Sequence, residues 1–157
     1  MNKILKLVVS ILVCQWAGIV GSLFTSPAIA SWYATLEKPS FNPPNWIFAP
    51  VWTLLFLLMG IALYFVWNSE IESNKKRIAI LIFAVQLVLN IFWSILFFGL
   101  QSPLYAFIEI IILWLAILLT IISFYKISKP AAELLLPYIL WVSFAAVLNF
   151  SILILNF

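Results

Sequence analysis

Apolar residues along this chain gather in five long segments that are separated by short polar stretches. Each segment holds about 20 residues, the length that a helix needs to cross a bilayer. The segments occupy residues 4–26, 46–67, 78–99, 103–125 and 134–156. Because the links between them are short, the pattern predicts an all-α integral membrane protein. We expect five transmembrane helices that form one domain over residues 1–157.

Composition supports this assignment. Hydrophobic residues make up 66% of the chain and charged residues 8%. The core of a water-soluble protein could not hide so much apolar surface. No basic stripe suggests nucleic acid as a partner, so we interpret the net charge of +3 as a signal of membrane orientation.

Basic residues fall almost entirely on one side of the predicted membrane. The N-terminus and the second and fourth loops carry seven Lys or Arg residues, whereas the opposite side carries only Lys38. Cytoplasmic loops are enriched in Lys and Arg. The sequence therefore predicts a cytoplasmic N-terminus, with the first loop and the C-terminus outside.

The first segment also has features of a cleaved signal peptide: a basic start, an apolar run and the triplet Ala28-Ile29-Ala30. The run is longer than usual and contains Gln15 and Gly18, which suit a packed helix, so we expect it to be retained. Two pairs of small residues, Ala17/Gly21 and Gly18/Ser22, indicate close helix approach. We expect them to pack inside the protomer rather than at a dimer face.

Residues 32–52 hold four of the eight prolines and three of the eight tryptophans. Pro39, Pro43 and Pro44 argue against a regular helix, because proline fixes φ and restricts the residue before it. A flexible tether would be rich in Gly and Ser. The stretch, which includes Phe41, fits either a shaped lid over a site or a rigid connector with aromatic residues at the membrane surface.

Several polar side chains lie inside the predicted spans, where such groups usually face protein or a water-filled cavity. The third span presents one face with the spacing i, i+4, i+7, i+11, formed by Gln86, Asn90, Trp93 and Phe97. The fifth span presents Trp141, Ala145 and Asn149 on one face. The second span adds Trp52 after Pro50, which we place in the first helical turn, where proline is tolerated.

The rise of an α-helix sorts these residues by depth. Trp52, Asn90, Trp93 and Asn149 fall in an outer layer, and Gln86 and Trp141 in a layer nearer the cytoplasm. The two layers are predicted to line one cavity. The alternative is that the amides join neighbouring helices by hydrogen bonds and the indoles fill space.

Glu109 is the only acid well inside a span, and an intramembrane carboxylate is a candidate functional group. It equally fits a hydrogen-bonded acid near the membrane surface. The chain has no histidine, no aspartate and one cysteine, Cys14. A Ser-His-Asp triad and an imidazole metal site are therefore excluded, and we expect neither a metal site nor a required cofactor.

An ordered set of short motifs resembles the TspO/translocator-protein family of tryptophan-rich sensory proteins. The motifs are Trp32-Tyr33, Lys38-Pro39-Ser40-Phe41, Pro43-Pro44, Pro50-Val51-Trp52-Thr53, Gln86 to Asn90 with Trp93, Pro137-Tyr138 with Trp141, and Ala145 with Leu148-Asn149. They run in order over nearly the whole chain.

The resemblance implies a five-helix homodimer with a pocket under the first extramembrane loop. It also implies porphyrins such as protoporphyrin IX as ligands, with many members binding cholesterol and benzodiazepine-type compounds. The carried-over pocket residues are Trp52, Asn90, Trp93 and Trp141, with Trp32 and Tyr33 from the loop. The C-terminal tail lacks the Tyr and basic residue of the animal cholesterol pattern, so the chain looks like a bacterial cell-membrane member.

The sequence therefore predicts a membrane protein that buries a tetrapyrrole between aromatic side chains, for sensing, transport or scavenging. One alternative is a small proton-coupled transporter that uses Glu109. Another, implied by the resemblance, is a light-dependent porphyrin-degrading enzyme. A third is a purely structural membrane subunit.

Overall fold

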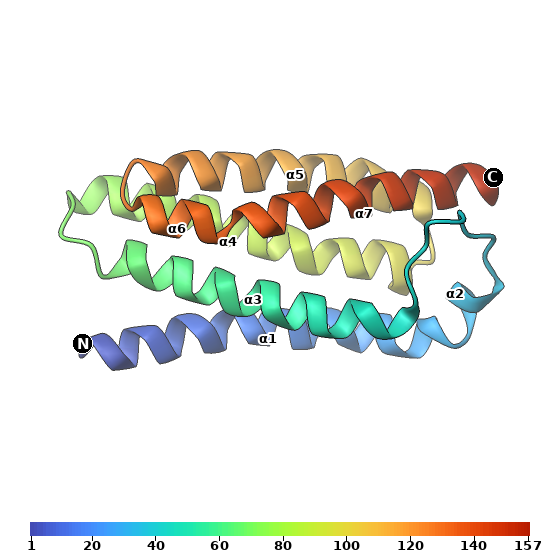
Figure 1. Cartoon of the computed structure of the whole chain (residues 1–157), viewed down its shortest axis with the longest axis horizontal. Helices are drawn as coiled ribbons and strands as arrows, with labels where there is room; N and C mark the ends of the chain where they lie inside the picture. Colours follow the sequence, from blue (N-terminus) through green and yellow to red (C-terminus); the bar gives the residue numbers. More distant parts are fainter.

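The computed structural model describes residues 1–157 and contains helices only, arranged as a lengthwise bundle with the two termini at opposite ends (Figure 1). The helices are α1 (Lys3–Ile29), α2 (Trp32–Thr35), α3 (Asn45–Trp67), α4 (Ser73–Ser94), the π-helix η1 (Ile95–Gly99), α5 (Pro103–Tyr125), α6 (Lys129–Leu134) and α7 (Leu136–Leu155). Five stretches are long and apolar enough to cross a membrane, with α4–η1 and α6–α7 each counted as one. The prediction of five transmembrane helices is confirmed.

Local sequence explains where several helices begin. The side chain of Asn2 accepts a hydrogen bond from the backbone N–H of Ile4, which caps α1. Ser102 caps α5 in the same way, by accepting from the N–H of Tyr105, and Pro103 occupies the first turn of that helix. The expectation for Pro50 was wrong: α3 begins at Asn45, so the proline lies beyond the first turn.

The spanning helices form a closed ring around a common core. The helix α1 packs on α3 and α4, α4 packs on α5, α5 packs on α7, and α6 returns to α3. Glycines set the closest approaches. A Cβ on Gly60 would lie 2.6 Å from the Cα of Ile11, and one on Gly18 would lie 2.7 Å from the Phe56 ring. These contacts are inside the protomer, as is that of the buried Gly21 with Ser94, so Gly18 and Gly21 both pack against other helices of the bundle.

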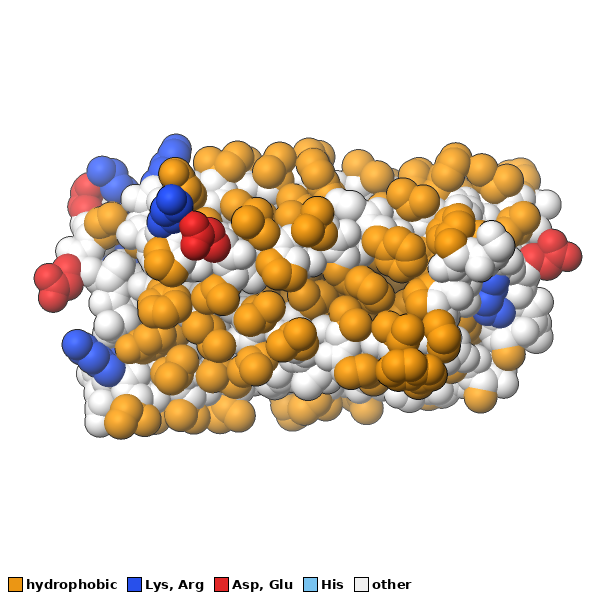
Figure 2. Space-filling model, viewed as in Figure 1, with side chains coloured by type: hydrophobic (Ala, Val, Ile, Leu, Met, Phe, Trp, Pro, Cys, Tyr) orange, Lys and Arg blue, Asp and Glu red, His pale blue; other side chains and the backbone are white.

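On the face shown in Figure 2, charged side chains lie toward the two ends of the bundle and apolar side chains cover most of the length between them. The one acid well inside a span, Glu109, is buried. The end that holds the N-terminus carries seven of the basic residues, while Lys38 lies at the other end, in the loop after α2. Two exposed ion pairs, Lys75–Glu72 at 3.5 Å and Lys129–Glu133 at 4.0 Å, also lie at the N-terminal end. This segregation is what a protein needs to span a membrane with its charges in water.

Candidate functional site

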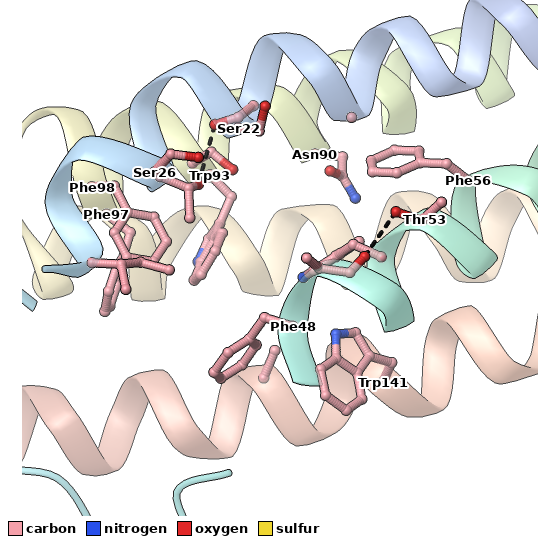
Figure 3. Close-up of a pocket in the computed structure, with 18 of the residues that line it drawn as sticks. Ser22, Ser26, Phe48, Thr53, Phe56, Asn90, Trp93, Phe97, Phe98 and Trp141 are labelled. Atoms are coloured by element: carbon pink, nitrogen blue, oxygen red, sulfur yellow. Dashed lines mark hydrogen bonds between the residues drawn. The ribbon is translucent and has the colours of Figure 1, made fainter. Parts of the chain in front are cut away.

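A cavity of about 320 Å³ lies in the half of the bundle that holds the C-terminus. Helices α1, α3, α4 with η1, and α7 form its walls, and α2 contributes Tyr33; α5 and α6 contribute nothing. Figure 3 shows Trp93, Phe97 and Phe98 on one side of the cavity, Phe48 and Trp141 on another, and Asn90 beside Phe56 on a third. The volume falls in the range of small-molecule pockets, and most of the lining residues are apolar, eight of them aromatic, as is usual in such pockets.

Most of the side chains that the sequence predicted as ligand-binding line this cavity. Its lining includes Tyr33, Trp52, Asn90, Trp93, Trp141 and Asn149. Gln86 and Trp32 do not line it, and neither do Pro39, Phe41, Pro43 and Pro44 of the loop. Trp32 instead packs its ring edge-on against Phe97, with ring centroids 5.5 Å apart.

Gln86 lies one layer below Asn90, in a buried polar network. The Tyr138 hydroxyl donates to Gln86 Oε1 at 2.8 Å and accepts from Asn90 Nδ2 at 2.7 Å. Because one hydroxyl satisfies two amides, the network fixes the Asn90 side chain. Asn90 Oδ1 accepts no hydrogen bond from the protein and remains free to accept one from a ligand.

A second amide fixes Trp93. Its indole N–H donates to Asn149 Oδ1 at 3.1 Å, and Asn149 Nδ2 donates to the Pro103 carbonyl at 2.9 Å. Asn149 therefore ties α7 to both α4 and the start of α5. The Trp93 ring stacks on Phe97, with centroids 5.0 Å apart and an interplanar angle of 19°. This pair forms a flat, rigid aromatic wall.

Trp141 lies higher in the bundle than the sequence predicted. The predicted fifth span began at 134, whereas α6 begins at Lys129 and adds more than a helical turn at the N-terminal end of the bundle. Trp141 consequently lies beside Phe48, with ring centroids 6.1 Å apart. This contact puts it in the outer layer that was predicted to hold Trp52 and Asn90. Its indole nitrogen is buried and has no hydrogen-bond partner. Figure 3 shows this nitrogen turned toward the cavity.

The proline-rich loop runs across the C-terminal end of the bundle and is fastened there. Asn156 accepts from the Glu37 N–H and donates to the Glu37 carbonyl, both at 2.9 Å. The Tyr33 hydroxyl donates to Asn42 Oδ1 at 2.9 Å, and Lys38 lies 4.7 Å from the Tyr33 ring centroid. Burial raises the pKa of Tyr33 above its ordinary value, while the bond to Asn42 lowers it.

Glu109 faces the inside of the bundle but does not line the cavity. It is 7% exposed, and neither carboxyl oxygen has a hydrogen-bond partner. No charged side chain lines the cavity at all. A ligand there would be held by ring stacking, apolar contact and a few hydrogen bonds.

Sequence reasoning missed the whole contribution of α1. Its lining face carries small and polar residues, namely Gln15, Gly18, Ser22, Thr25 and Ser26. A polar stripe at helical spacing was the available signal, but the small residues alone were interpreted as packing. Phe98 was also missed, because the π-helix η1 changes the angular spacing and brings both Phe97 and Phe98 to the cavity.

Comparison with known proteins shows similarity over nearly the whole chain. A family profile, described as "TspO/MBR family", matches residues 10–155. The tryptophan-rich protein TspO of Chlorobaculum tepidum is 52% identical over 158 residues, which is 99% of each chain. Its namesake from Archaeoglobus fulgidus is 52% identical over 98% of this chain and 99% of its own. The translocator protein of Homo sapiens is 36% identical over 85% of this chain and 79% of its own.

Proposed function

The chain belongs to the TspO/MBR family of membrane proteins, and from this premise we propose that it binds a tetrapyrrole such as protoporphyrin IX in its aromatic cavity. The observation that carries the proposal is the combination of flat aromatic walls with unpaired polar atoms. Buried polar groups without a partner are rare in proteins and call for an explanation. The Trp141 N–H is such a group, and a ligand acceptor in the cavity would satisfy it.

Each wall has a distinct role in this proposal. Trp93, stacked on Phe97, offers a flat face for the macrocycle, and Trp52 and Trp141 offer ring surface from α3 and α7. Stacked aromatic pairs contribute about 0.5–1.5 kcal/mol beyond the burial of their area. Asn90 offers its Oδ1 to a pyrrole N–H or another donor, because its Nδ2 is held by the hydrogen bond that it donates to Tyr138 and its oxygen accepts none from the protein.

We also propose the orientation and assembly that the sequence predicted. The seven basic residues at the N-terminal end support a cytoplasmic location for that end, with the proline-rich loop and the C-terminus outside. The exposed apolar sides of the bundle contact lipid and, in a homodimer, a second copy of the chain. The alternative of a proton-coupled transporter gains no support from Glu109, since this side chain does not line the cavity.

A binding titration tests the proposal. Protoporphyrin IX is added to the purified protein in lipid nanodiscs, and its absorbance band is followed for the parent, Trp93→Ala and Trp52→Ala. Loss of one stacking indole should weaken binding by about 1–3 kcal/mol, or about 5- to 150-fold. Trp16→Ala is the matched control, because Trp16 lies on α1 but is 66% exposed on its outer face.

A parent that does not bind the porphyrin would refute the proposal. If the parent binds and all three variants retain its affinity, the indoles serve packing and the porphyrin binds elsewhere. Loss of the porphyrin spectrum under light, with a defined product, would instead support the degrading activity that was the alternative from the sequence.

A further inference from the structure

The cavity has one open side, between the halves of α1 and α3 that lie nearest the proline-rich loop. Several of its lining residues are exposed on the surface of the bundle, and all of these belong to α1 or α3. They are Ile19, Ser22, Ser26, Asn45, Ala49 and Thr53. Every lining residue of α4, η1 and α7 is buried or half-buried.

Packing explains why this seam opens. Toward the N-terminal end, α1 and α3 touch at Gly60 and Ile11, where a Cβ would lie 2.6 Å from the Ile11 Cα. Next along the seam, Gln15 Nε2 donates to the Thr53 carbonyl at 3.1 Å. Beyond this hydrogen bond the lining side chains of the two helices include small ones, such as Ser22 and Ala49, and no further side-chain hydrogen bond joins α1 to α3.

The other boundaries of the cavity are filled by side chains. Between α3 and α7, the Phe48 and Trp141 rings lie 6.1 Å apart and separate the cavity from an open groove on the outside of these two helices, which is lined by residues such as Leu54, Leu140 and Phe144. Between α1 and α4, a Cβ on Gly21 would already lie 3.2 Å from Ser94 Oγ.

The proline-rich loop crosses the C-terminal end of the bundle without lining the cavity, and Tyr33, just before it, is a lining residue. The loop is held by two hydrogen bonds between Glu37 and Asn156 and by the bond from Tyr33 to Asn42. Exit past the loop would break these contacts, whereas exit between α1 and α3 would break none of them.

Chemistry at the opening differs from chemistry inside. The interior offers aromatic rings and no charged side chain, so an ionised carboxylate taken into it would lose its hydration without a countercharge. At the opening, Ser26 and Asn45 offer hydroxyl and amide donors close to water and lipid headgroups. Ser22 adds a hydroxyl that donates to the Ile19 carbonyl at 2.7 Å and would have to turn to reach a ligand. A porphyrin with carboxylates along one edge matches this division.

We propose that the seam between α1 and α3 is a lateral entrance from the leaflet next to the proline-rich loop. A ligand with a flat apolar body and a carboxylate edge enters body first, and its carboxylates stay between Ser22, Ser26 and Asn45. This inference rests on the proposed binding of a tetrapyrrole and adds its route and its orientation.

The position of the carboxylates is tested by adding one positive charge. Ser26→Lys places an ammonium at the entrance, and Gln101→Lys places one at the same end of the bundle, between η1 and α5. Ser26→Lys should tighten the binding of protoporphyrin IX about 2- to 5-fold, the scale of an exposed ion pair, and should not tighten that of its dimethyl ester. Gln101→Lys should change neither. An equal gain in both variants, or no gain in Ser26→Lys, would overturn the orientation.

The route is tested by narrowing the entrance. Ala49→Trp fills the gap, and Leu54→Trp, on the exposed side of the same helix, is the control. Stopped-flow measurements should show at least about 10-fold slower association and dissociation for Ala49→Trp, and parent rates for Leu54→Trp. Replacing Pro39, Pro43 and Pro44 with Gly, Ser and Gly should leave both rates unchanged.

Helical circular dichroism confirms that each variant is folded. If the parent binds neither the porphyrin nor its ester, the proposed function fails. If the parent binds, but Ala49→Trp exchanges ligand at the parent rate or the loosened loop speeds exchange, the lateral entrance alone is wrong.

Discussion

Trp141 allows the indole N–H to be separated from the indole ring. Trp141→Phe keeps an aromatic side chain but removes the buried N–H that has no partner. An unpaired buried donor costs about 1–3 kcal/mol, and the unliganded protein bears this cost. If a ligand accepts from this N–H, binding relieves the cost. The substitution should then weaken ligand binding by about 1–3 kcal/mol, or about 5- to 150-fold.

The opposite sign is expected for the unliganded protein. Loss of the unpaired N–H offsets part of the packing that is lost against Phe48 and Phe144. Trp52→Phe is the matched control, because it makes the same change of size at a lining position with no buried unpaired nitrogen. Trp141→Phe should therefore lose less thermal stability than Trp52→Phe.

Porphyrin absorbance titrations give the affinities without relying on tryptophan fluorescence, and thermal unfolding in the same nanodiscs gives the stabilities. The reasoning is refuted if the two variants bind the porphyrin equally well. It is equally refuted if Trp141→Phe binds weakly and is also the less stable of the two, since packing alone would then account for both results.

Two further predictions concern the scaffold. Gly60→Ala should lower the free energy of unfolding by about 1–3 kcal/mol, because its Cβ would lie 2.6 Å from the backbone of Ile11. Gly99→Ala should cost less, because its Cβ would meet only side-chain atoms, the nearest being a ring carbon of Phe24 at 3.2 Å. Equal losses in a denaturation series would contradict this. Burial keeps the pKa of Tyr33 above its ordinary value of about 10, so the folded state holds this proton more tightly than the unfolded state and stability falls as pH rises beyond about 10. Tyr33→Phe removes the hydroxyl, and with it both the hydrogen bond to Asn42 and this fall in stability at alkaline pH. If the variant loses stability above about pH 10 as the parent does, other groups control the alkaline pH dependence.

Hydropathy located the spanning helices well where polar residues mark their ends. The structure gives α5 as Pro103–Tyr125, the range predicted from the sequence, because Ser102 and Pro103 start the helix and Lys126 follows it. Prediction was less accurate at the N-terminal end of the bundle. Helix α4 begins at Ser73, because a helix can extend beyond the bilayer in a polar sequence that hydropathy does not register.

Helical periodicity predicted cavity-lining residues correctly where the helix is regular, and missed them elsewhere. Asn90 and Trp93 were found because their spacing places them on one face of α4. Phe98 was not, because the π-helix adds a residue to the turn and breaks that spacing. The predicted depth of Trp141 was wrong, because α6 begins at Lys129, before the apolar segment from which depth was counted. Ser22 and Ser26 of α1 were missed because serine is common both in cavity walls and where helices pack closely, so the residue type alone does not distinguish the two.

The polar groups of the bundle divide according to whether the protein itself satisfies them. The Tyr138 hydroxyl joins Gln86 to Asn90, and Asn149 separately holds Trp93, so both walls are fixed before any ligand arrives. The Trp141 N–H and Asn90 Oδ1 remain without partners from the chain. A preformed wall lowers the entropy lost on binding, and an unpaired donor raises the affinity for a ligand that supplies an acceptor. Affinity should therefore depend on where a flat ligand places its acceptor, and not only on the apolar area that it buries.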